Sequence, residues 1–166
     1  MMRIGLVIDT GYIPSTKNLH IFLKELCKKA EVILFLSKKL LKEYEGRGVF
    51  SRFEQQLEYK IKRLRKYCKE IRIHKQRFSL YIHIIERSKL VEYEQMLYQA
   101  IKGPLKKDIK VFELVCFAAR RTDKAFLLTL DQEILRKGYD ILRRVFSPDY
   151  EKIAIVSNIE FLLESI

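Results

Sequence analysis

Short apolar runs alternate with amphipathic stretches along most of the chain, and this alternation constrains the fold more than any other feature. The runs IGLVID, EVILFLS, AFLLTLD and KIAIVS are mostly apolar, which is typical of parallel strands that are buried on both faces. The stretches between them repeat apolar residues three or four positions apart, as an amphipathic helix does. Alternating strands and helices predict an α/β fold with a mostly parallel central sheet.

The chain shows no internal boundary. It has 166 residues, no repeat and no linker rich in Pro, Gly or Ser, so we expect a single domain over residues 1–166. Ser37 and Asn158 are expected to cap the helices that follow them. Helices are predicted over 19–30, 38–46, 50–69, 84–102, 105–121, 132–144 and 158–166, and EIRIHKQRF is a candidate for a further strand.

The charge of the chain is strongly unbalanced. It has 33 Lys and Arg against 21 Asp and Glu, a formal net charge of +12. Such an excess favours nucleic acid or another anionic partner. The alternative is a set of solvated basic helix faces with no polyanion bound to them.

Cysteine use and the N-terminal residues bear on the cellular compartment. The three cysteines have no CxxC spacing, a pattern that indicates reduced thiols inside a cell. The first apolar run is too short for a signal peptide and is interrupted by Asp9. No run approaches the roughly 20 apolar residues of a membrane span. We therefore expect a cytoplasmic protein with no membrane partner.

Two predicted strands end in an acid. Asp9 closes IGLVID, and Asp131 follows AFLLTL. Because the carboxyl ends of parallel strands meet at the same edge of a sheet, we expect both carboxylates there. Each alone is equally consistent with a turn residue or a helix cap. Together they repel each other unless a cation neutralises them, and oxygen ligands without Cys or His suit Mg²⁺ or Mn²⁺.

Two further residues are placed to serve these acids. Thr129 stands two positions before Asp131 and so shares its face of the strand. Its hydroxyl is expected to hold a carboxylate or a metal-bound water, although it also reads as an ordinary β-branched strand residue. Glu43 flanks the apolar stripe of the helix predicted over 38–46. A surface pair with Lys39, four positions earlier, is the simpler interpretation of Glu43.

Several motifs resemble the PIN-domain family of metal-dependent nucleases. VIDTGYI, FLSKKLLKEYEG, AFLLTLDQEIL and IAIVSNIEFL occur in the order found in that family. The resemblance covers residues 3–46 and 104–163. It implies a three-layer α/β/α PIN-like fold with a basic helical insertion at about 47–103. It also implies a Mg²⁺- or Mn²⁺-dependent ribonuclease. A second copy of the chain, in a homodimer, and an antitoxin protein are the further partners that it suggests.

The same resemblance implies a set of site residues. Asp9, Glu43, one acid on the helix after Pro104 and Asp131 would be catalytic, with Thr10 as a supporting residue. The third acid is Asp108 or Glu113. The apolar residues that follow Asp108 favour it as the third acid, since they place it on the buried stripe of a helix, near the end at which the dipole favours an anion. Asp9, Asp108 and Asp131 would then hold the metal, with Glu113 in a supporting role.

The predicted helix over 50–69 carries the densest positive charge. Four basic residues share one side of it, and tyrosines nearby could stack on bases, as RNA-binding surfaces do. The alternative is a solvated amphipathic helix. A nucleic-acid-binding PIN-like module that does not cleave is the second interpretation of the whole chain. The candidate RNA-binding residues are Lys62, Arg63, Lys66 and Lys69.

Overall fold

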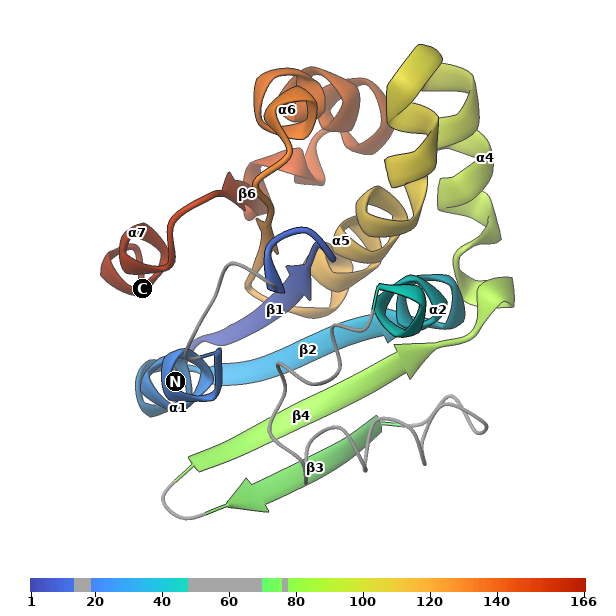
Figure 1. The fold of residues 1–166 in the computed structure, drawn as a ribbon. Coiled ribbons are helices and arrows are strands. Elements are labelled where there is room, and N and C mark those ends of the chain that lie inside the picture. The colour runs from blue at the N-terminus through green and yellow to red at the C-terminus, as the bar shows by residue number, and fades with distance from the viewer. Residues whose placement is uncertain (14–18, 48–69, 76–77) are drawn as a thin grey trace.

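The computed structural model describes residues 1–13, 19–47, 70–75 and 78–166 of the chain. Its strands form one six-stranded sheet in the order β3-β4-β2-β1-β5-β6 (Figure 1). Five strands run parallel, and β3 lies antiparallel to β4 at one edge. The predicted mostly parallel α/β sheet is therefore confirmed. The strand bounds are β1 Arg3–Ile8, β2 Glu31–Ser37, β3 Glu70–Lys75, β4 Phe78–Ile85, β5 Lys124–Leu128 and β6 Ile153–Val156.

Helices flank this sheet in the three-layer arrangement that was expected. α5 packs on β1 and β5 with α4 and α6 beside it, while α1 and α7 lie together on the other side (Figure 1). Short 3₁₀ turns over Arg87–Lys89, Gly103–Asp108 and Asp149–Lys152 connect elements. The helix bounds are α1 Leu19–Lys29, α2 Lys38–Gly46, α4 Val91–Ala100, α5 Ile109–Arg121, α6 Gln132–Phe146 and α7 Ile159–Glu164.

The region 47–103 differs from the helical insertion that was expected. Its described part holds the strands β3 and β4, then the 3₁₀ turn over Arg87–Lys89, and a single α-helix, α4. The expected start of a helix at Ile84 is wrong: β4 runs to Ile85, and α4 begins at Val91. The physical reason is burial, since Ile82 and Ile84 are fully buried in the strand that pairs with β2. The predicted helix over 50–69, with Lys62, Arg63, Lys66 and Lys69, lies outside the described residues.

Helix α5 approaches the sheet closely at a glycine. A Cβ at Gly5 would lie 2.9 Å from the Cβ of Ala118 and 3.1 Å from the ring of Phe35. Glycine in the middle of β1 therefore lets α5 lie against this strand. This close approach holds α5 against β1, at whose carboxyl end the candidate site lies.

Between β1 and β5, the connections that follow these two strands lead toward opposite edges of the sheet. From β1 the chain continues to β2 on one side, whereas β5 pairs with β1 on the other. In open α/β sheets, ligands bind outside the carboxyl ends of the strands at such a point. Ile8 and Leu128 are register partners at the ends of β1 and β5. The residues that follow them, Asp9 and Thr129, therefore emerge side by side.

Over residues 1–13, 19–47, 70–75 and 78–166, no helix has both the length and the apolar character needed to cross a bilayer.

Candidate functional site

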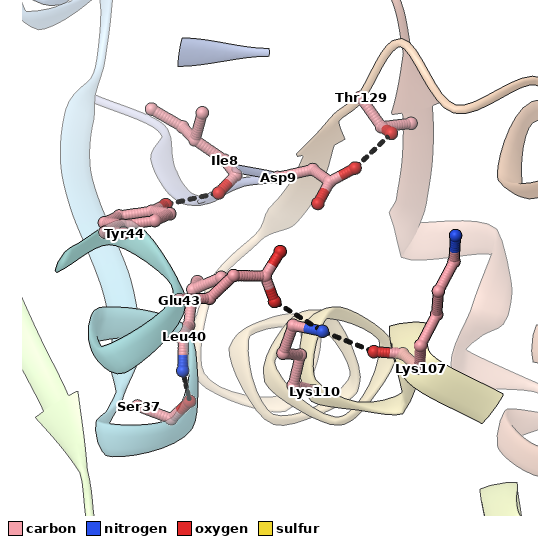
Figure 2. Close-up of polar contacts among 9 residues, drawn as sticks. All are labelled: Ile8, Asp9, Ser37, Leu40, Glu43, Tyr44, Lys107, Lys110 and Thr129. Atoms are coloured by element: carbon pink, nitrogen blue, oxygen red, sulfur yellow. Dashed lines mark hydrogen bonds and ion pairs between the residues drawn. The ribbon is translucent and has the colours of Figure 1, made fainter. Parts of the chain in front are cut away.

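Asp9 and Thr129 are joined directly at the carboxyl ends of β1 and β5. The backbone N–H of Asp9 donates to the carbonyl of Leu128 at 2.8 Å, so the pairing of the strands extends to the acid. The Thr129 hydroxyl donates to Asp9 Oδ2 at 2.8 Å (Figure 2). The same hydroxyl accepts from the backbone N–H of Asp131 at 3.1 Å. Both side chains are buried. Thr129 thus holds one acid and fixes the backbone of the other.

Asp131 is the N-cap of α6. Its Oδ1 accepts from the backbone N–H groups of Glu133, at 2.9 Å, and Ile134, at 3.1 Å. The helix-cap interpretation of this acid is therefore correct as far as Oδ1 is concerned. Capping accounts for one of its two oxygens and holds the carboxylate beside Thr129.

Asp108 lies at the end of a 3₁₀ turn, immediately before α5. Its side chain is 6% exposed and makes no capping bond, and its Oδ2 has no hydrogen-bond partner in the described part of the chain. Burial, and then the negative charges of Asp131 and Asp9, raise the pKa of the Asp108 carboxyl from 3.8 to about 6. The charges of the two acids at the ends of β1 and β5 therefore act on Asp108.

Glu113 faces a different group of charges. It is also buried, with an unpartnered Oε2 among the described residues. Burial raises its pKa to about 7, and the charges that act on it are those of Lys39, Glu94, Arg87 and Lys110. Asp9 and Asp131 are not among them. Of the two candidates for the third acid, Asp108 is the one whose pKa is raised by the charges of Asp131 and Asp9.

Glu43 enters the site from α2. This helix is capped by Ser37, whose Oγ accepts from the Leu40 N–H at 3.2 Å. The hydroxyl of Tyr44, fully buried, donates to the carbonyl of Ile8 and so ties α2 to the end of β1. The negative charge of Glu43 contributes to raising the pKa of Asp9, although burial of Asp9 is the larger cause.

The partner of Glu43 is not the one that the sequence favoured. Glu43 Oε2 pairs with Lys110 Nζ at 2.5 Å, whereas Lys39 pairs with Glu94 at 3.2 Å. The expected pair with Lys39 is therefore wrong, because α2 turns Glu43 toward α5 and Lys39 toward α4. Lys110 was missed in the sequence. A signal for it existed, since a lysine in the first turn of a helix is unfavourable unless an acid lies nearby.

Thr10 is the remaining supporting residue. It is fully buried, and its hydroxyl oxygen has no hydrogen-bond partner among the described residues. Its backbone N–H donates to Asp9 and lowers the pKa of that acid, against the larger effect of burial. A buried hydroxyl without a hydrogen-bond partner is rare in folded proteins, and this one stands next to the buried acid Asp9.

The side chains do not form a finished metal centre. As they stand in the part of the chain that the structure describes, no three His, Cys, Asp or Glu residues form a group that could hold a metal ion. The donor set nevertheless fits Mg²⁺ or Mn²⁺ chemically, because it consists of carboxylates and includes the unpartnered Oδ2 of Asp108. A bound ion would require the acids to move closer together than they lie here.

No protein-family model matches this chain, and no curated protein shows significant similarity to it.

Proposed function

We propose that this protein is a Mg²⁺- or Mn²⁺-dependent ribonuclease that resembles the PIN family and hydrolyses RNA phosphodiester bonds. Asp9, Glu43, Asp108 and Asp131 are the proposed catalytic residues, and Asp9, Asp108 and Asp131 are the proposed metal ligands. The observation that carries the proposal is the buried Asp108 carboxyl, which has one unpartnered oxygen among the described residues and is acted on by the charges of Asp131 and Asp9.

Structural roles do not account for this arrangement. Asp131 caps α6, but Asp108 caps nothing, and its raised pKa reflects burial near like charges. An acid in such a position costs stability unless a cation compensates it. The site also lies at the point of the sheet where ligands of open α/β folds bind. A divalent cation is the ligand that would relieve the repulsion.

The residues of the chain have distinct proposed roles in the reaction. When bound, the divalent ion would activate a water and offset charge on the phosphate. Thr129 fixes the Asp9 carboxylate by a hydrogen bond, and the backbone of α6 fixes that of Asp131. Tyr44 locks the end of β1 to α2, which carries Glu43. The chain therefore contributes acids held in fixed orientations, which is how positioning lowers a barrier.

RNA is the proposed substrate because the net charge of +12 favours a polyanion. Binding of RNA by Lys62, Arg63, Lys66 and Lys69 rests on the sequence alone. A homodimer, an antitoxin partner and a cytoplasmic location are predictions from the resemblance and the composition. They await direct measurement.

A second candidate function is a nucleic-acid-binding module that does not cleave. The observation in its favour is that the described residues form no complete metal-binding group, while Lys110 neutralises Glu43. Such a module would bind RNA without needing a metal ion.

One experiment separates the two functions. Labelled single-stranded RNA is incubated with Mn²⁺, with and without EDTA, and with wild type, Asp9→Asn, Asp108→Asn and a control, Asp140→Asn. Asp140 is an exposed acid on α6 that pairs only with Arg143 in the described structure. We expect cleavage by wild type and the control, and none by the other variants or in EDTA. RNA that is bound but never cut by wild type would favour the non-cleaving module.

A further inference from the structure

We propose that the ammonium group of Lys110 is a built-in cation that occupies the Glu43 side of the site, so that the site takes one divalent ion and not two. This inference rests on the proposed function, because it concerns the number of metal ions that the same carboxylates hold. It assigns to Lys110 the role of a positioning residue that acts through Glu43.

The first support is the fixed position of the ammonium group. Lys110 Nζ pairs with Glu43 Oε2 at 2.5 Å and also donates to the backbone carbonyl of Lys107 (Figure 2). The side chains of Lys110 and Glu43 are only 17% and 23% exposed. Three of the chain's segments, α2, the turn before α5 and α5 itself, therefore meet at this one charge. Such a half-buried pair is screened less than a pair on the surface.

The second support is that the ion pair with Lys110 takes up a carboxylate oxygen of Glu43 that a second metal ion would need. Two metal ions that act together lie about 3.5–4 Å apart and need carboxylates on both sides of the pair. Asp108 responds to the charges of Asp131 and Asp9, and the charge of Glu43 acts on Asp9, so all four acids belong to one cluster. Glu43 enters this cluster from α2, and its Oε2 is already neutralised by Lys110. A second ion would have to displace the ammonium group to gain a ligand there.

The third support is the location of Lys110 in its helix. It is the second residue of α5, where the helix dipole disfavours a cation. Its contact with Glu43 and with the Lys107 carbonyl offsets this cost. Lys107, and then Lys110, also lower the pKa of Asp108, against the larger effects of burial and the neighbouring acids. Its charge thus acts on the acid cluster as well as on Glu43.

The test is the number of Mn²⁺ ions bound per chain, measured by titration with electron paramagnetic resonance detection of free and bound Mn²⁺. The variants are Lys110→Met, which removes the charge and keeps the length of the side chain, and Lys107→Met as the matched control. The side chain of Lys107 is exposed, and only its backbone carbonyl contacts Lys110. Lys110→Met combined with Glu43→Gln removes the freed ligand as well.

We expect one Mn²⁺ for wild type and Lys107→Met, two for Lys110→Met, and one again for the double variant. Two ions in wild type would overturn this inference and leave the proposed metal-dependent function standing. One ion in a folded Lys110→Met variant would also overturn it. No bound Mn²⁺ in wild type would overturn the proposed function together with the inference. If Lys110→Met does not fold, Lys110→Gln replaces it with the same expected count.

Discussion

Replacing Asp108 by Asn should make the metal-free protein more stable. The substitution keeps the shape of the side chain, removes its charge and breaks no capping bond. The pKa of Asp108 rises from 3.8 to about 6 on folding, which corresponds to about 3 kcal/mol of unfavourable free energy when the group is ionised. Because Asp108 is only 6% exposed, little of this energy is screened by water.

The sign of the effect follows from the direction of the pKa change. Well below pH 3.8 the carboxyl is protonated in both the folded and the unfolded chain, so Asp108 costs nothing there. As the pH rises toward about 6, the unfolded chain loses its proton first, and the free energy of unfolding of wild type falls. We therefore expect Asp108→Asn to be more stable than wild type by about 3 kcal/mol at pH 8, and by little near pH 4.

The assay is urea unfolding in EDTA across this pH range, repeated with Mn²⁺ at pH 8. Glu113→Gln is the matched control, because Glu113 is equally buried on α5 and has a pKa raised to about 7, but faces other charges. Both variants should gain stability in EDTA. Mn²⁺ should stabilise wild type and Glu113→Gln by binding to the folded state, and should stabilise Asp108→Asn much less.

Two results would refute this reasoning. Equal stability of Asp108→Asn and wild type at pH 8, with the same dependence on pH, would show that Asp108 is not destabilised by its surroundings. Equal stabilisation of both proteins by Mn²⁺ would show that Asp108 is not a ligand.

Three further substitutions test the packing and hydrogen bonds around the site. Thr129→Val should lower the free energy of unfolding, measured in urea, by about 1–3 kcal/mol, because Asp9 Oδ2 loses its hydrogen-bond donor. Unchanged stability would mean that this hydrogen bond is weak. Gly5→Ala should lower the free energy of unfolding by about 1–3 kcal/mol and lower the midpoint of thermal unfolding, because the new Cβ would lie 2.9 Å from that of Ala118. An unchanged midpoint would show that α5 moves away freely. Tyr44→Phe should cost about 1 kcal/mol in the same urea assay, because its hydroxyl no longer donates to the end of β1, and a more stable variant would contradict this.

The parts of the site that follow local patterns could be predicted from the sequence. Asp9 and Asp131 directly follow apolar strand runs, and the rule for parallel sheets then places them at the same edge. Ser37 and Asn158 were recognised as caps, and both accept capping bonds in the structure. These features need only a few neighbouring residues to be decided.

The parts that depend on distant contacts could not be predicted. The ion pair of Glu43 with Lys110 joins α2 to α5 and depends on how these two helices are turned toward each other. The end of β4 was also missed: Ile84 and Ile85 fit a buried strand or the start of a helix equally well, and pairing with β2 decides between them. Such choices are made by tertiary packing, which no short window of sequence contains.

The position of the antiparallel strand β3 determines which changes of sequence related chains can accept without disturbing the site. It occupies the outer edge of the sheet, with β4 and β2 between it and β1. Strands lie about 4.8 Å apart, so β3 lies roughly 14 Å from β1. Insertions or deletions at that edge leave the hydrogen bonds around Asp9 in place. Related chains are therefore free to acquire different outer surfaces, and with them different preferences for binding partners, while the acids at the centre of the sheet stay where they are.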